Sequence, residues 1–284
     1  MPSQYRIVEA ILLLILATVC IGGCGESAKS PPTMRNPASA AAPFALDTRP
    51  MEARGPKRAN FERELASRDA RYVADWVVDS GDSKSMPFAI VDKIDAKVFV
   101  FDADGLLRGA TVALLGLARG DGSVPGIGDR AFSDIRPEER TTPAGRFVAE
   151  LGRNLRRDTT LWVDYDEGFA MHALRAANPK ERRPQRLATP TPLDNRISFG
   201  CVIVPVTFFE NVVRPAFAGT KGIVYVLPET KLASAVFASY DVDERAQRQS
   251  ASRKLNDGNT RLAQLAPFTA HTLQSEQTGF PASR

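Results

Sequence analysis

The chain has 284 residues, of which 43% are hydrophobic and 25% are charged, and its formal net charge is +4. This composition is typical of a globular protein, and it excludes both a chain disordered throughout and a membrane protein with several spans. Lysine and arginine are interspersed with aspartate and glutamate, so no basic arm stands out. We therefore expect no nucleic-acid partner.

The N-terminal residues have the pattern of an export signal. Arg6 precedes an apolar run at residues 11–21, which Gly22, Gly23 and Cys24 follow. The run is shorter than the about 20 apolar residues of a membrane span. A charged start, a short apolar stretch and small residues before a cleavage point are typical of a signal peptide. An ordinary secretory signal and an uncleaved anchor are the alternatives to a lipoprotein signal.

The segment Ile21-Gly22-Gly23-Cys24 resembles a bacterial lipobox. The resemblance implies that residues 1–23 are removed, that Cys24 is lipidated and that the chain is held to a membrane on the periplasmic side. Gly25 stands where an aspartate is associated with inner-membrane retention, so the outer membrane is the favoured location.

The cysteine count then singles out one thiol. Of the three cysteines, Cys20 would be lost with the signal and Cys24 would carry the lipid, which leaves Cys201. The mature chain would therefore hold no disulfide. An unpaired cysteine in an oxidising compartment is a liability unless it is buried or used.

Composition divides the rest of the chain into four parts. Residues 24–58 are rich in Ser, Ala, Pro and Thr and are predicted to be a flexible tether. Residues 59–84 are predicted to hold an amphipathic helix that packs on the domain as an appendage, because apolar residues recur at helical spacing between Asn60 and Asp79. Residues 85–230 are predicted to be the catalytic domain. Residues 231–284 are expected to be a polar tail, with a short helix or disorder.

The domain is predicted to be mostly β, with a few short helices. Two apolar runs, 88–91 and 97–101, predict a hairpin. Further strands are expected within 106–117 and at 145–151, 161–164, 169–174 and 222–227. One interior helix is expected at 207–214, where Thr207 and Glu210 have capping-box spacing and Pro215 would end the run.

Cys201 and His172 are the candidate catalytic pair. A cysteine nucleophile needs a base or a cation to form the thiolate, and an imidazole is the usual partner. Only two histidines occur, and His271 lies in the predicted tail. Strand alternation places His172 opposite the apolar residues Phe169 and Met171. We expect His172 to raise the thiolate fraction of Cys201, and Gly200 to let a substrate approach closely; the alternative is that both residues are structural.

Three blocks of the domain resemble the L,D-transpeptidase catalytic domain of bacterial cell-wall enzymes. They are Thr141-Thr142-Pro143-Ala144-Gly145-Arg146-Phe147, Met171-His172-Ala173 and Ser198-Phe199-Gly200-Cys201-Val202. The resemblance covers about residues 86–229. It implies a β-sandwich-like fold and a cysteine thioester formed on peptidoglycan stem tetrapeptides, which an amine then resolves as a 3→3 crosslink or a protein anchor.

The resemblance also assigns roles by position. Cys201 is the nucleophile, His172 the base, and the backbone carbonyl of Ala173 the group that orients the imidazole. Amides around Gly200 and Cys201 would hold the oxyanion. The chain departs from the family pattern in having Phe199 in place of the signature histidine and Ile203 where an arginine is usual. Phe199 and Ser198 are expected to contact the substrate.

The stretch between the two catalytic blocks is rich in proline, and regular structure is not expected at 178–195. Two interpretations are open: a lid whose Arg182, Arg183 or Arg186 meets stem carboxylates, and a solvated surface loop. No cofactor is expected, and a metal site is disfavoured because the histidine, the cysteine and the carboxylates do not cluster. The sequence leaves the oligomeric state open.

Three functions are consistent with the residues. The first is the transpeptidase. The second is an L,D-carboxypeptidase or peptidase that uses the same acyl-enzyme and water. The third is a lipoprotein that binds peptidoglycan without catalysis.

Overall fold

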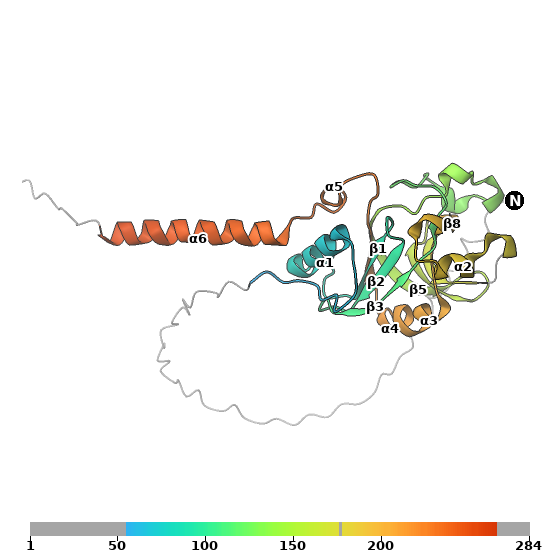
Figure 1. Cartoon of the computed structure of the whole chain (residues 1–284), viewed down its shortest axis with the longest axis horizontal. Coiled ribbons are helices and arrows are strands. Elements are labelled where there is room, and N and C mark those ends of the chain that lie inside the picture. Colours follow the sequence, from blue (N-terminus) through green and yellow to red (C-terminus); the bar gives the residue numbers. More distant parts are fainter. Residues whose placement is uncertain (1–54, 176–177, 266–284) are drawn as a thin grey trace, which may run out of the picture. The chain divides into compact units, whose positions relative to one another are not determined.

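The computed structural model describes residues 55–175 and 178–265 (Figure 1). The strands are β1 (Phe88–Asp92), β2 (Lys97–Phe101), β3 (Leu107–Val112), β4 (Leu115–Gly116), β5 (Gly145–Arg153), β6 (Thr159–Asp164), β7 (Phe169–Ala173), β8 (Arg196–Ser198), β9 (Val202–Val204) and β10 (Gly222–Val226). The α-helices are α1 (Arg68–Ser80), α2 (Arg183–Ala188), α3 (Val206–Phe208), α4 (Arg214–Ala216), α5 (Ala233–Phe237) and α6 (Val242–Leu265). Single helical turns lie at η1 (Ile127–Asp129), η2 (Phe132–Asp134), η3 (Pro137–Glu139), η4 (Pro179–Glu181), η5 (Pro192–Asp194) and η6 (Phe209–Val213).

The strands confirm the prediction of a mostly β domain with a few short helices. Eight of them form one mixed sheet in the order β3-β2-β1-β10-β5-β6-β7-β9, and β4 pairs with β8 in a second, two-stranded sheet. The predicted hairpin is present, with Phe88 opposite Phe101. The predicted strand β7, which carries His172, and the strand β9, which follows Cys201, are parallel neighbours at one end of the large sheet.

Strand β5 makes the sheet sandwich-like, because its two halves serve different neighbours. Residues 145–149 pair with β10, and residues 150–153 pair with β6. The alternate residues of β1 and β2 therefore face the same apolar cluster as those of β6, β7 and β9. Ala89, Val100, Leu161, Met171 and Val202, all buried, are members of this core.

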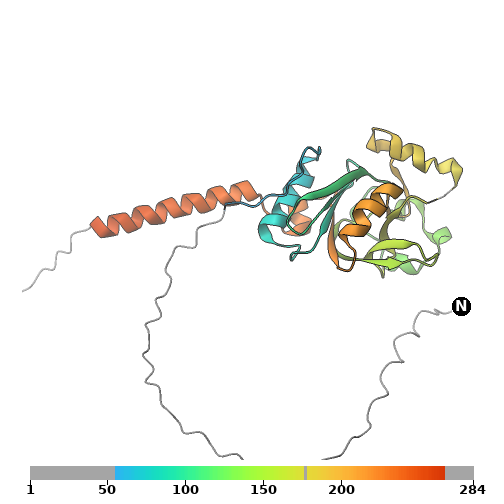
Figure 2. The same cartoon turned by 90° about the horizontal axis from the view of Figure 1, so that it is seen from below.

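Helices cover both faces of the β1–β2–β10 half of the sheet (Figures 1 and 2). Phe209 and Phe217, from the segment that runs through α3, η6 and α4, pack into the core just described. On the other face, α1 and α5 pack against β1, β2 and β10 and form a second buried cluster. The second cluster includes Phe61, Trp76 and Phe237.

Helix α1 is shorter than predicted, because it begins at Arg68, whereas helical spacing of apolar residues was found from Asn60 on. Ser67 caps it, accepting a hydrogen bond from the Ala70 N–H at 3.1 Å, and Gly81 ends it in the left-handed region. Phe61 is buried although it precedes the helix, whereas Leu65 is exposed. Because the helix buries its apolar face on the sheet, it is part of the packed unit.

The interior helix also differs from the prediction. Pro205, not Thr207, is the N-cap, and no side-chain cap is present. The run continues through the π turn η6 into α4, where Pro215 is the second residue. Proline lacks the N–H that a helical turn needs. It is tolerated here because it occupies the first turn of a new helical segment.

The chain after residue 230 contributes to the packing. Phe237 in α5 and Val242 at the start of α6 belong to the second cluster, so the packed unit extends beyond 230. Helix α6 has 24 residues, longer than the predicted short helix, and its side chains described beyond Val242 are mostly exposed. Near its start, Arg58 pairs with Asp243, and Arg245 pairs with Asp79 at 2.8 Å.

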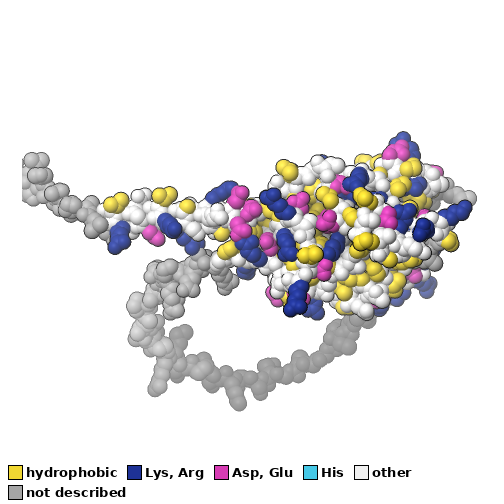
Figure 3. Space-filling view, viewed as in Figure 1, with side chains coloured by type: hydrophobic (Ala, Val, Ile, Leu, Met, Phe, Trp, Pro, Cys, Tyr) yellow, Lys and Arg dark blue, Asp and Glu magenta, His cyan; other side chains and the backbone are white. Residues whose placement is uncertain are grey.

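Surface charge is mixed on the face shown in Figure 3, where basic and acidic side chains alternate. Within residues 55–175 and 178–265, no helix is both long enough and apolar enough to span a membrane. The predicted signal peptide, Cys24, most of the tether and His271 lie outside the described residues.

Candidate active site

Cys201 lies in a tight turn between β8 and β9. Gly200, the residue before it, has φ of +134°, and a Cβ there would meet the Thr141 carbonyl oxygen at 2.8 Å. Both the backbone angle and the close approach require glycine. The cysteine is partly exposed, and its Sγ lies 3.7 Å from the Gly168 carbonyl oxygen in the β6–β7 turn.

Two buried hydroxyls hold the backbone of this turn. Ser198 Oγ accepts from the Gly200 N–H at 3.1 Å and donates to the Cys201 carbonyl at 2.7 Å. Thr142 Oγ1 donates to the Gly200 carbonyl at 2.8 Å. Ser198 is only 2% exposed, and both hydrogen bonds of its hydroxyl lie within the turn. The expected contact of Ser198 with a substrate stays a prediction. The Gly200 N–H, an expected oxyanion donor, is already occupied by Ser198.

His172 lies in β7, and Cys201 immediately precedes the adjacent strand β9. Met171 pairs with Val202 in the parallel β7–β9 ladder, and both point into the core. Side chains alternate along a strand, so His172 and Cys201 point to the opposite face. Strands about 4.8 Å apart, with an offset of two residues along the ladder, place their Cα atoms roughly 8 Å apart.

The imidazole of His172 is oriented by the backbone. Its Nδ1 lies 2.8 Å from the Ala173 carbonyl oxygen, the contact that the resemblance implies. A carbonyl can only accept, so Nδ1 carries the proton and Nε2 has the free lone pair. A neutral imidazole in this tautomer is a proton acceptor on the side that faces away from Ala173.

Partial burial disfavours the charged forms of both the His172 imidazole and the Cys201 thiol. Burial lowers the pKa of His172 to about 4, and the nearby positive charges of Arg175 and Arg183 oppose its protonation as well. Burial also raises the pKa of the Cys201 thiol, and the same two arginines only partly offset this. The direction of this pKa shift is opposite to the raised thiolate fraction that we expected for Cys201. His172 and Cys201 share no hydrogen bond in the structure.

Phe199 packs against the segment that precedes the Thr141 block. The Arg140 guanidinium lies 4.0 Å above its ring centroid, and the Phe132 ring lies at 5.0 Å. Arg140 also donates to the Ile135 carbonyl through two nitrogens, at 3.2 and 3.0 Å. Phe199 thus anchors this segment beside the cysteine turn. Phe132 is 71% exposed and leaves an aromatic surface there.

We expected the proline-rich insert to lack regular structure. The structure shows instead that it contains η4, α2 and η5. Three of its prolines each lie at one of the first two positions of a helical turn, where a backbone N–H would have no partner within the helix. They are Pro179, Pro184 and Pro192. Proline content therefore shortens these helices without preventing them.

The three arginines of the insert differ in their surroundings. Arg183 is mostly buried, pairs with Glu181 at 2.6 Å and acts electrostatically on both His172 and Cys201. Arg186 is held within the insert, donating to the backbone carbonyls of Glu181 and Asp194. Arg182 is exposed, with φ of +51°. Only Arg183 is thus placed to influence the pair.

Two residues near the pair had no role assigned from the sequence. Arg175 pairs with Asp158 at 3.2 Å and donates to Thr160 Oγ1 at 3.0 Å, beside the site. Thr142 belongs to a block that we quoted for its resemblance alone. A buried threonine hydroxyl leaves no periodic signal in the sequence, whereas the position of Arg175, three residues after His172, could have suggested its proximity.

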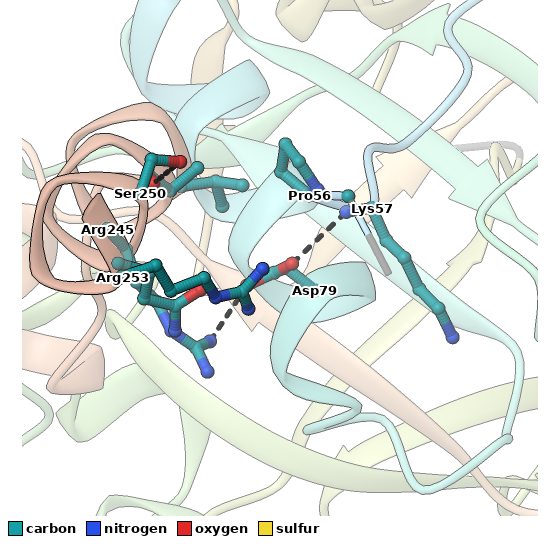
Figure 4. Close-up of a pocket in the computed structure, with 10 residues that line it drawn as sticks. Pro56, Lys57, Asp79, Arg245, Ser250 and Arg253 are labelled. Carbon is teal, nitrogen blue, oxygen red and sulfur yellow. Dashed lines mark hydrogen bonds and ion pairs between the residues drawn. The ribbon is translucent and has the colours of Figure 1, made fainter. Parts of the chain in front are cut away.

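Two surface hollows lie away from this pair. One, of about 270 Å³, lies between the first described residues, α1 and α6, where Lys57, Asp79, Arg245, Ser250 and Arg253 are among the lining residues (Figure 4). The other, of about 370 Å³, is lined by residues of β5 and the α4–β10 turn. In the part of the chain that the structure describes, no group of three or more His, Cys, Asp or Glu residues is arranged to hold a metal.

Part of this chain is similar to part of several solved structures. No family model and no curated protein matches the chain. The helical cell shape determining protein Pgp2 from Campylobacter jejuni is 17% identical, with a TM-score of 0.35, over 57% of this chain and 52% of that one. An L,D-transpeptidase from Mycobacterium tuberculosis H37Rv is 16% identical, with a TM-score of 0.32, over 50% of this chain and 57% of that one.

A further L,D-transpeptidase, from Xylanimonas cellulosilytica, is 14% identical, with a TM-score of 0.31, over 50% of this chain and 61% of that one. The chain therefore spans between about half and three fifths of the length of these structures. What it does has to be inferred from its own residues.

Proposed function

We propose that this chain is a cysteine-dependent acyltransferase of the L,D-transpeptidase type that acts on peptidoglycan stem tetrapeptides. The observation that carries the proposal is the placement of one thiol, just before β9, beside the neighbouring strand β7, which carries an oriented imidazole. The three sequence blocks that resemble the family supply the cysteine turn, the histidine strand and the threonine that supports the turn.

The chemistry follows from the neutral state of the pair. When the donor binds, Cys201 Sγ attacks the carbonyl between the L- and D-centres, and its proton passes to Nε2 of His172. The imidazolium then protonates the departing amine of the terminal D-alanine. The thioester that remains is attacked by an acceptor amine, which forms a new amide and returns the thiol. If water attacks instead, the product is a shortened stem.

Positive charge at the site suits this substrate class. Arg175 and Arg183 both act on the catalytic pair, and each is only partly neutralised by one carboxylate partner. Stem peptides carry several carboxylates, which guanidinium groups bind through charge-assisted hydrogen bonds. We assign Arg183, from the insert, as the contact for a stem carboxylate.

The proposal also covers where the reaction takes place. The lipobox-like segment before Cys24 supports a chain held to a membrane by a lipid, on the side where peptidoglycan lies. These residues lie outside the described part of the chain, and the favoured outer-membrane location rests on Gly25 alone.

The test is intact-mass analysis of the full chain after incubation with a stem tetrapeptide. We expect an adduct with the mass of the tripeptide acyl group, and none with Cys201→Ala or with a peptide that ends in L-alanine. Adding an acceptor amine then separates transfer, which gives a new amide, from hydrolysis, which gives free tripeptide. If the peptide binds and no adduct forms, the chain is a peptidoglycan-binding lipoprotein instead.

A further inference from the structure

The peptide group between Gly200 and Cys201 is held at one end only. Its carbonyl accepts from Thr142 Oγ1 at 2.8 Å. No cis peptide bond occurs among the described residues, and in a trans peptide the C=O and the N–H point in opposite directions. The hydrogen bond to Thr142 therefore directs the Cys201 N–H away from Thr142.

The Thr142 hydroxyl has no freedom to turn. It is fully buried, accepts from the Gly116 N–H at 2.8 Å and uses its single proton on the Gly200 carbonyl. The backbone of Thr142 is fixed as well, because its carbonyl accepts from the buried Lys93 Nζ at 3.0 Å. The orientation of the peptide group is thus set by a rigid buried support.

The free end of the peptide group belongs to the residue that carries the sulfur. Covalent geometry therefore keeps the Cys201 N–H close to the Cys201 Sγ. No described residue accepts a hydrogen bond from the Cys201 N–H. This donor is available to an oxygen that approaches the sulfur, whereas the Gly200 N–H is taken by Ser198.

We propose that Thr142 is a positioning residue that directs the Cys201 N–H at the oxyanion formed when the thiol attacks a carbonyl. This rests on the proposed acyl transfer and identifies the amide that stabilises it. Donors fixed in advance are effective because they need no reorganisation as charge develops. A hydrogen bond at the carbonyl end also polarises the same peptide group and strengthens its N–H as a donor.

The test compares two reactions of Cys201 in the full chain. Acetylation by p-nitrophenyl acetate develops an oxyanion, whereas alkylation by iodoacetamide displaces iodide from a saturated carbon and develops none. Thr142→Val removes the hydroxyl with little change of shape. We expect acetylation to slow by about 10- to 100-fold, somewhat less than the loss of an oxyanion donor altogether, with alkylation within about threefold of the parent.

Two variants serve as controls. Thr142→Ser keeps the hydroxyl and should restore the acetylation rate to within about threefold. Thr111→Val makes the same change in β3, at a hydroxyl with no hydrogen bond among the described residues, and should alter neither rate. If the Val variant does not fold, Thr142→Ala replaces it, since the space that it leaves can admit a water.

The proposal is overturned if acetylation and alkylation fall together, because Thr142 would then only support the fold, and also if neither falls. The outcome is independent of the physiological substrate. A wild-type chain that forms no adduct with stem tetrapeptides, but whose acetylation depends on Thr142 in the expected way, would remove the proposed function and leave the role of Thr142 in place.

Discussion

At the scale of single residues, burial governs the candidate catalytic pair. It lowers the pKa of His172 and raises that of Cys201, so both are uncharged near neutral pH. Catalytic pairs of this kind can start either as an ion pair or as two neutral groups. The directions of these two shifts favour the neutral form, in which, under the proposed acyl transfer, His172 would act as a general base during attack.

The pH dependence of acylation tests this state. Since the pKa of His172 is about 4, its basic form is present above that pH and is lost below it. As the pH falls, we expect the first-turnover acylation rate to drop with a midpoint near pH 4, because His172 becomes protonated there. An unperturbed histidine has a pKa of about 6.5. Circular dichroism at each pH checks that the chain stays folded. A midpoint near 6.5 would show that the imidazole is hydrated.

Phe199 gives a second test at this scale. The sequence resemblance places it where the family signature has a histidine, and in the structure it packs under Arg140. If His172 is the base, Phe199→His alters only packing and pocket shape, and acylation of Cys201 should stay within about tenfold of the parent, while donor preference changes. Loss of a general base costs about 10²- to 10⁴-fold, so a gain of thousands from this substitution would mean that the natural chain lacks its base.

At the scale of elements, one buried lysine joins the segments that surround the cysteine turn. Lys93 Nζ, in the β1–β2 turn, donates to the Gly120 carbonyl at 2.5 Å, to Asp121 at 2.8 Å and to the Thr142 carbonyl at 3.0 Å. Although burial opposes it, hydrogen bonds from Lys93 and Thr230 hold the pKa of Asp121 well below its usual range. The same carboxylate accepts from three backbone N–H groups at 229–231.

Removing the positive charge of Lys93 should lower the free energy of unfolding of the whole domain. Lys93→Met leaves Asp121 buried without its cation, and breaking a buried ion pair costs about 3–5 kcal/mol. Lys97→Met is the matched control, since Lys97 pairs with Glu64 on the partly exposed side of β2 and should cost about 1 kcal/mol or less. Urea unfolding measures both free energies. Equal losses in the two variants would show that the Lys93 network contributes no more than a surface pair.

At the scale of the whole molecule, two parts serve different purposes. Residues 55–175 and 178–265 contain the sheet, its helices and the candidate site. The segment before them has the composition of a tether and begins after a lipobox-like motif. Under the proposed lipid anchor at Cys24, a tether of this composition would let the domain reach a polymer at a distance set by the tether's length.

Membrane attachment is tested through Cys24. We expect Cys24→Ala to release the protein from the membrane fraction and to abolish labelling by a radioactive fatty acid, because lipidation needs the thiol. Cys201→Ala is the control and should remain in the membrane fraction. If the Cys24 variant still fractionates with membranes and the parent carries no lipid label, an uncleaved apolar segment is the anchor.

The sequence by itself predicted the mostly β class, the first hairpin and the strand that carries His172. The reason is that strand alternation and apolar runs are local patterns, read within a few residues. That Cys201 and His172 act as a pair stays a prediction, made because the only other histidine lies in the predicted tail.

Tertiary structure decided what depends on distant segments. Helix α1 begins at Arg68, because Ser67 caps it and Phe61 packs separately on the sheet. The protonation states of His172 and Cys201 follow from burial, which no local pattern specifies. The role of Thr142 depends on its contact with Gly200, 58 residues away in the chain, and a hydrogen bond between distant segments exists only once the chain has folded.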